Sequence, residues 1–110
     1  MTFFESIKNL DLKVIFRTMH EMNGGWYPWS SNPEAFQEAW RHIWRLSRAV
    51  GLDQSHILFD FSVNAWDLPA KDRNPSQTTV YEHCYPKVKD KLGCPSFEDY
   101  YPGDAYVDLV

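Results

Sequence analysis

Three stretches of the chain carry apolar patterns regular enough to predict secondary structure. Residues 12–20 contain a nearly continuous apolar run around Val14-Ile15-Phe16, and residues 56–62 contain a second one. Short runs without polar alternation are typical of parallel strands that are covered on both faces. Between them, residues 33–50 place apolar side chains at steps of three and four, which predicts an amphipathic helix.

The predicted helix has start and stop signals at both ends. Asn32 is a favourable N-cap, Pro33 suits the first helical position, and Gly51 is placed to end the helix. The apolar face is expected to consist of Phe36, Ala39, Trp40, Ile43, Ser47 and Val50. A strand, a helix and a strand joined by short links form a βαβ unit, so we expect two parallel strands with a right-handed crossover.

The remaining segments carry weaker patterns. Residues 1–11 indicate a short helical or irregular lead, and residues 66–99 form a polar stretch that we interpret as a long loop or insertion. Residues 100–110 contain a Pro102-Gly103 turn and then enter a strand. At 110 residues the chain is at most one domain, 1–110, of the α/β class.

Composition narrows the range of functions. A hydrophobic content of 44% and an aromatic content of 16% predict a folded chain, and a net charge of −4 disfavours nucleic acid or an anionic membrane as partner. The cysteines Cys84 and Cys94 lack zinc or CxxC spacing, which leaves a free pair or, in an oxidising compartment, a local disulfide. No metal, phosphate or cofactor motif is visible in the sequence, so we expect no cofactor.

Candidate chemistry lies where the first predicted strand ends. His20 and Glu21 stand at that end, and Asn23-Gly24-Gly25 permits a sharp turn with positive φ. Three aromatic residues follow: Trp26, Tyr27 and Trp29. Aromatic rings stack on sugar faces and a carboxyl group can protonate a glycosidic oxygen, so the pattern indicates a carbohydrate site. A strand that ends in His-Glu for structural reasons, with the aromatics as a hydrophobic lid, is the alternative.

The stretch from Arg17 to Trp29 resembles glycoside hydrolase family 26, the family of β-mannanases and related β-glycanases. The resemblance continues at Ala39-Trp40-Arg41-His42, at Ser62 and Asn64, and from Tyr100 to Asp108. It implies a partial (β/α)8 barrel that covers roughly the fourth strand to the start of the sixth. A complete barrel of this kind needs about 250 residues.

The resemblance also implies roles for individual residues. Glu21 would be the general acid/base, His20 would position it or the sugar, and Trp26 would form part of the subsite wall beside the cleaved bond. The expected substrate-binding residues are His20, Trp26, Arg17, Asn64, Tyr27 and Trp29. The expected substrate is a β-linked polysaccharide or oligosaccharide, cleaved with retention of configuration by an endo-β-1,4-mannanase-like reaction. The particular glycan is left open.

Two features near the second strand depart from the family pattern. Phe61-Ser62-Val63-Asn64 stands where Trp-Ser-Pro-Asn is common, and Val63 in place of proline implies a changed loop path. Asp60 is an unusual residue for the interior of a barrel strand, because a buried carboxylate needs a partner or a raised pKa. Either it pairs with Arg17, or its face is exposed because the barrel is incomplete.

The second carboxylate of a retaining site has no clear candidate. By resemblance it would be a glutamate on the seventh barrel strand, and the acids Asp60, Glu82, Glu98, Asp104 and Asp108 do not match that context. We therefore expect the 110-residue chain alone not to hydrolyse β-mannan.

Two alternatives to an enzyme stay open: a non-catalytic carbohydrate-binding relic, and a self-associating structural domain. If the chain folds alone, we expect its open sheet edges to be covered by the long loop, by a second copy or by a complementing chain. Met1 to Lys8 lacks the features of a signal peptide, although many family members are secreted. The location is therefore left open between a cytoplasmic protein and one whose natural N-terminus is missing.

Overall fold

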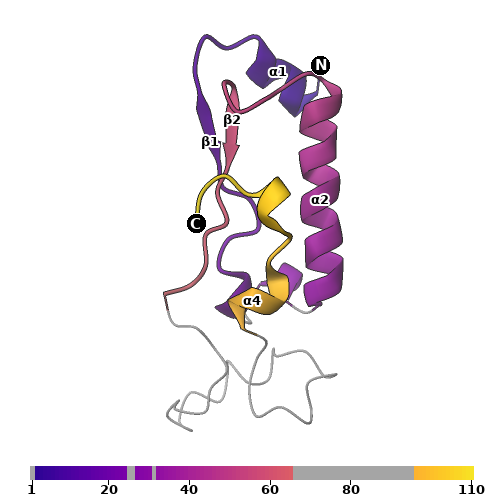
Figure 1. Ribbon diagram of the computed structural model, residues 1–110, viewed down its shortest axis with the longest axis vertical. Helices are drawn as coiled ribbons and strands as arrows, with labels where there is room; N and C mark the ends of the chain where they lie inside the picture. Colours follow the sequence, from indigo (N-terminus) through magenta and orange to yellow (C-terminus); the bar gives the residue numbers. More distant parts are fainter. Residues whose placement is uncertain (1, 25–26, 31, 66–95) are drawn as a thin grey trace, which may run out of the picture.

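A computed structural model describes residues 2–24, 27–30, 32–65 and 96–110 of the chain. The strands β1 (Val14–Phe16) and β2 (Ile57–Phe59) lie side by side, and the helix α2 (Pro33–Ala49) runs along them (Figure 1). The predictions that concern Trp26, Glu82, Cys84, Cys94 and most of the long polar stretch, residues 66–95, lie outside the described residues.

The two strands form a parallel pair, which confirms the predicted βαβ order. Val14 is paired with Ile57, and Phe16 is paired with Phe59. Both strands are shorter than the predicted ranges of 12–20 and 56–62. The first is shorter because the chain turns away from the strand-to-strand ladder directly after Phe16.

The end of the chain meets the other edge of β2. Leu109 forms a parallel bridge with Asp60, and the N–H of Phe61 donates to the carbonyl of Leu109 at 2.8 Å. The carboxylate of Asp108 accepts from the main-chain N–H of Phe59 at 2.8 Å. The predicted final strand is thus reduced to this short contact, preceded by a 3-10 turn at Asp104–Tyr106.

Helix α2 begins and ends where its capping residues predicted. The side chain of Asn32 accepts from the N–H of Ala35 at 3.1 Å, and Gly51 has a φ of +88° just past the helix. Phe36, Trp40 and Ser47 are buried on the inner face. Ala39 is exposed, contrary to the prediction, because it lies about 100° around the helix from Trp40.

Shorter helices complete the described part. The predicted N-terminal lead is the helix α1 (Phe3–Lys8), which a capping box between Thr2 and Glu5 begins. The helix α4 (Phe97–Tyr100) begins within the stretch 66–99 that the sequence predicts to be a loop, and ends one residue beyond it. Among the described residues, none of these helices has the length and apolar character needed to cross a bilayer.

Side chains of α2 hold the C-terminal segment by its main-chain oxygens. The indole N–H of Trp40 donates to the carbonyl of Tyr106 at 2.8 Å, and Arg41 Nε donates to that of Pro102 at 2.8 Å. The hydroxyl of Tyr100 donates to the carbonyl of Ser30 at 2.6 Å, and burial raises the pKa of this hydroxyl. These contacts fix the chain beside the strand ends.

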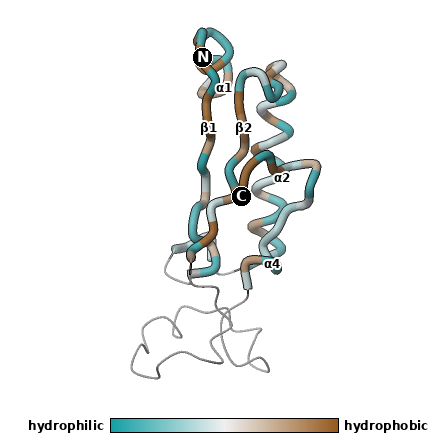
Figure 2. The backbone as a smooth tube through the Cα atoms, turned by 60° about the vertical axis from the view of Figure 1, so that its left-hand side comes forward, coloured by the Kyte–Doolittle hydropathy of each residue, from teal (hydrophilic) through white to brown (hydrophobic). Residues whose placement is uncertain are grey.

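One face of β1 is less covered than the sequence predicted. Phe16 packs edge-on against Phe59 in the core, whereas Ile15, which points the other way, is 61% exposed. Figure 2 shows that both strands are apolar along their length. The expectation of strands covered on both faces is wrong for β1 within the described part of the chain.

Candidate functional site

The candidate site lies at the C-terminal end of the two strands, as the sequence predicted for Glu21. The main-chain N–H of Glu21 donates to the carbonyl oxygen of Ser62, just past β2, at 2.8 Å. Glu21 itself is half-buried. The C-terminal ends of parallel strands are where α/β folds of the barrel type gather their reactive side chains.

The route of the chain into Glu21 differs from the prediction of a strand that continues to residue 20. The carbonyl of Phe16 accepts the last regular hydrogen bond between the two strands, from the N–H of Asp60 at 3.0 Å. Residues 17–20 then leave the sheet edge, and the chain returns to it at Glu21. Met19 and Glu21 have φ values of +46° and +53°, a left-handed conformation that is costly for residues other than glycine.

An aromatic cluster stands beside the carboxylate-bearing segment. The rings of Tyr27 and Trp29 are stacked with centroids 4.3 Å apart, and His20 meets Tyr27 edge-on at 5.0 Å. A ring nitrogen of His20, Nε2, is hydrogen-bonded to the hydroxyl of Tyr27 at 3.1 Å. The predicted neighbours His20, Tyr27 and Trp29 are therefore brought together, while Trp26 lies outside the described residues.

Trp29 also has a structural task that the sequence did not indicate. Its indole N–H donates to the main-chain carbonyl of His20 at 3.0 Å. This bond fixes the peptide directly before Glu21, so the aromatic cluster and the carboxylate are one connected unit.

Arg17 forms an ion pair with Asp60. Arg17 Nε lies 2.8 Å from Asp60 Oδ2, and the hydroxyl of Ser62 donates to the same oxygen at 3.0 Å. Asp60 is only 6% exposed. Of the two alternatives for this unusual acid, the ion pair with Arg17 is the one that the structure contains.

Asn64 joins the site through its main chain. The side chain of Asn23 donates to the carbonyl of Asn64 at 3.2 Å and accepts from its N–H at 2.8 Å. The sequence assigned Asn23 only to a turn, yet it is 1% exposed, and its neighbour Met22 is fully buried. Asn23 lies in a short 3-10 helix, Met22–Gly24, and no local pattern marks its burial, because its partner Asn64 is 41 positions away.

The arrangement combines a stacked aromatic pair with a carboxyl group on the adjoining segment. The rings of Tyr27 and Trp29 stack on each other, so each presents mainly its other face to its surroundings. Glu21 adds a carboxyl group that can exchange a proton with a glycosidic oxygen. Within the described residues, no group of three acidic, histidine or cysteine side chains is arranged to hold a metal ion.

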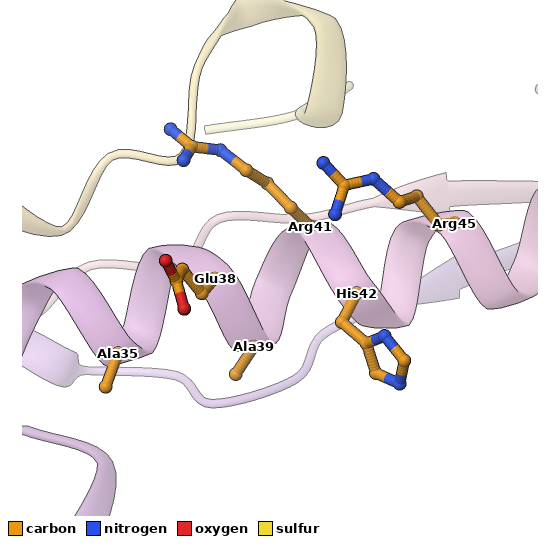
Figure 3. Close-up of a pocket in the computed structure, with 6 residues that line it drawn as sticks. All are labelled: Ala35, Glu38, Ala39, Arg41, His42 and Arg45. Carbon is orange, nitrogen blue, oxygen red and sulfur yellow. The ribbon is translucent and has the colours of Figure 1, made fainter.

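A separate shallow depression lies on the outer surface of α2 (Figure 3). It is lined by Ala35, Glu38, Ala39, Arg41, His42 and Arg45, and it shares no residue with the group around Glu21. In Figure 3, Arg41 and Arg45 point away from His42 on the helix surface. Arg41 Nε already donates a hydrogen bond to the carbonyl of Pro102, so we interpret this surface as one on which α2 packs against the C-terminal segment.

Comparison with known proteins identifies the family of the sequence. The model of glycosyl hydrolase family 26 matches residues 2–110, nearly the full chain.

Two curated relatives match in sequence. Endoglucanase H of Acetivibrio thermocellus is 29% identical over 113 aligned residues, which cover 96% of this chain and 10% of that protein. Mannan endo-1,4-beta-mannosidase A of a Piromyces species is 28% identical over 89 residues, which cover 70% of this chain and 14% of that protein. The chain therefore spans only a small part of the length of either relative.

Proposed function

Because the chain belongs to glycosyl hydrolase family 26, we propose that it carries the acid/base half of a β-glycanase site of the retaining, endo-β-1,4-mannanase-like type. Glu21 is the acid/base, and the rings of Tyr27 and Trp29, with His20, bind the sugar. The observation that carries the proposal is the bond from Glu21 N–H to Ser62 O at the strand ends, beside the aromatic cluster. The match to a mannosidase and an endoglucanase supports the β-glycan as substrate class.

In this reaction a nucleophile attacks the anomeric carbon while the glycosidic C–O bond breaks. Glu21 delivers its proton to the leaving oxygen. His20 is hydrogen-bonded to Tyr27 and its carbonyl to Trp29, so the residue before Glu21 is held on both its ring and its main chain. Such support keeps the carboxyl oriented toward a sugar that lies on the rings.

We further propose that the chain alone does not hydrolyse β-mannan. A retaining site needs a second carboxylate about 5–5.5 Å from the first. In the described part of the chain, Asp60, Asp104 and Asp108 each accept structural hydrogen bonds, from Arg17, Tyr101 and Phe59 respectively. Their carboxylates are therefore committed to holding the fold.

The test supplies the missing nucleophile as azide. Mannohexaose is incubated with the 110-residue chain with and without sodium azide, and products are identified by mass spectrometry. We expect binding, no hydrolysis in water, and slow formation of a glycosyl azide that is lost in Glu21→Gln. His42→Gln, on the outer surface of α2, is the matched control and should leave the reaction unchanged.

The other outcomes decide between the alternatives. Binding without azide-dependent cleavage would favour a non-catalytic carbohydrate-binding domain, which the stacked Tyr27 and Trp29 rings also support. Robust hydrolysis of mannan in water that disappears in Glu21→Ala would refute the proposed inactivity. If the chain bound neither mannohexaose nor cellohexaose, the proposed site would be contradicted.

A further inference from the structure

The edge of β2 that faces β1 is hydrogen-bonded well beyond the two strands. His56 O accepts from Val14 N at 2.8 Å, Asp60 N donates to Phe16 O at 3.0 Å, and Ser62 O accepts from Glu21 N at 2.8 Å. Successive even-numbered residues of the second segment thus face the first segment, as expected along one strand edge.

The next even-numbered residue on this edge is Asn64, and the side chain of Asn23 meets its main chain. Asn23 Nδ2 donates to Asn64 O at 3.2 Å, and Asn64 N donates to Asn23 Oδ1 at 2.8 Å. A primary amide carries a donor and an acceptor side by side, as two neighbouring peptide groups do. The side chain of Asn23 therefore extends the ladder by one step, buried at 1% exposure.

This pair stands directly after a strained segment. Met19 and Glu21 both have left-handed φ values, a conformation that is costly for a residue with a Cβ atom. Hydrogen bonds at three points hold this segment. Before Glu21 the indole N–H of Trp29 donates to His20 O, and at Glu21 the main-chain N–H donates to Ser62 O. After Glu21 the side chain of Asn23 bonds to the main chain of Asn64. Without the last of these bonds, the chain on one side of Glu21 can relax.

We infer that Asn23 is a positioning residue that holds Glu21 in its left-handed conformation through the reciprocal amide pair with the main chain of Asn64. This inference rests on the proposed function only for the consequence that a displaced Glu21 protonates its substrate poorly. The conformational part stands on the described contacts alone. It assigns Asn64 a structural contribution through its peptide.

The conformational test is hydrogen exchange of individual main-chain amides by NMR. Asn23→Ala removes both bonds to the main chain of Asn64, so the Glu21 amide should lose protection by about tenfold to a hundredfold. The amide of Trp40, in the middle of α2, should keep its protection. Ser47→Ala also removes a buried hydroxyl, which donates to Trp44 O at 2.7 Å, and should leave Glu21 unchanged.

Asn23→Asp separates hydrogen bonding from packing. At neutral pH the introduced carboxylate has the shape of the amide but no donor, so Glu21 should exchange as fast as in Asn23→Ala. When the pH is lowered until this carboxyl is protonated, it regains a donor and an acceptor, and protection relative to the intrinsic exchange rate should return. A packing role alone would not produce this recovery in Asn23→Asp and its absence in Asn23→Ala.

The catalytic consequence is measured in the azide reaction. Asn23→Ala should lower the rate of glycosyl azide formation at least tenfold and change the affinity for mannohexaose less than about twofold, because Glu21 acts mainly in the transition state. Unchanged Glu21 exchange in Asn23→Ala would overturn the inference. Altered exchange together with cleavage that does not depend on Glu21 would instead contradict the proposed function.

Discussion

Trp40 and Tyr106 are joined by a hydrogen bond of 2.8 Å from the indole N–H of the helix residue to the main-chain oxygen of the C-terminal segment. The two residues are 66 positions apart in the chain. Trp40 has no exposed surface, and its ring meets Phe59 and Phe61 edge-on at 6.0 and 5.7 Å. One side chain thus ties α2, the β2 segment and the end of the chain together.

Trp40→Phe should destabilise the protein by about 2–3 kcal/mol, because it leaves a void and an unpaired carbonyl. The measurement is the free energy of unfolding in urea. Trp44, half-buried, contacts the ring of Tyr106 and Arg48, so Trp44→Phe should cost about 1 kcal/mol or less. Equal costs for the two variants would contradict the central position of Trp40.

The ion pair between Arg17 and Asp60 leads us to predict how the free energy of unfolding depends on their two charges. Arg17→Met leaves the nearly buried carboxylate with only the Ser62 hydroxyl and should cost about 1–2 kcal/mol, a value lowered by the exposure of Arg17. Asp60→Asn should cost less, since one amide oxygen can accept both bonds that Oδ2 accepts.

The double variant Arg17→Met with Asp60→Asn checks the origin of this cost. A neutral amide needs no cation, so the double variant should recover much of the stability lost in Arg17→Met. Additive losses in urea unfolding would show that the two residues contribute separately, through packing rather than through their charges.

Asp53 should make stability depend on pH in the acid range. Hydrogen bonds from the hydroxyl and main-chain N–H of Ser55, with a further bond from His56, lower the pKa of Asp53 to about 2. A carboxyl group with a depressed pKa in the folded state stabilises it fully above its ordinary pKa of about 4. That contribution is lost as the pH falls through about 2.

We therefore expect the difference in Tm between the natural chain and Asp53→Asn to be constant near neutral pH and to shrink as the pH falls from about 4 toward about 2. Thermal unfolding followed by circular dichroism measures it. Asp11→Asn, which removes an exposed carboxylate elsewhere, is the control and should not reproduce the effect. A difference that grows on acidification would contradict the assigned direction.

The open face of β1 allows the alternative of a self-associating domain to be tested. Ile15 is 61% exposed and Leu12 is 70% exposed beside a strand that, within the described part of the chain, pairs only with β2. An edge strand that also carries exposed apolar side chains favours pairing between copies. We expect the molar mass from light scattering to rise with concentration and Ile15→Lys to suppress the rise.

Leu46→Lys is the matched control for self-association, because Leu46 is also an exposed apolar residue, 46% accessible, but lies on α2. It should leave the concentration dependence unchanged. A chain that stays monomeric at every concentration, or equal suppression by both variants, would remove the support for an interface along β1.

Local signals in the sequence were sufficient for the βαβ order and the bounds of α2. Asn32, Pro33 and Gly51 act within one turn of the helix end, so their effect does not depend on distant residues. The position of Glu21 at the strand ends also followed from the sequence, since an apolar run followed by His-Glu and a turn is a local pattern. The family resemblance is confirmed by the match over residues 2–110.

Only the tertiary structure decided how Glu21 is held. The loop of residues 17–20 away from the sheet, the partner of Asp60 and the buried position of Asn23 all depend on contacts across about 40 residues, such as the bond from Glu21 N to Ser62 O. Hydrogen bonds to main-chain atoms carry no side-chain signature at the accepting residue, so Ser62 and Asn64 could not be identified as those partners from sequence. A left-handed φ at Met19 and Glu21 was equally hidden, because surrounding contacts rather than local preference impose it.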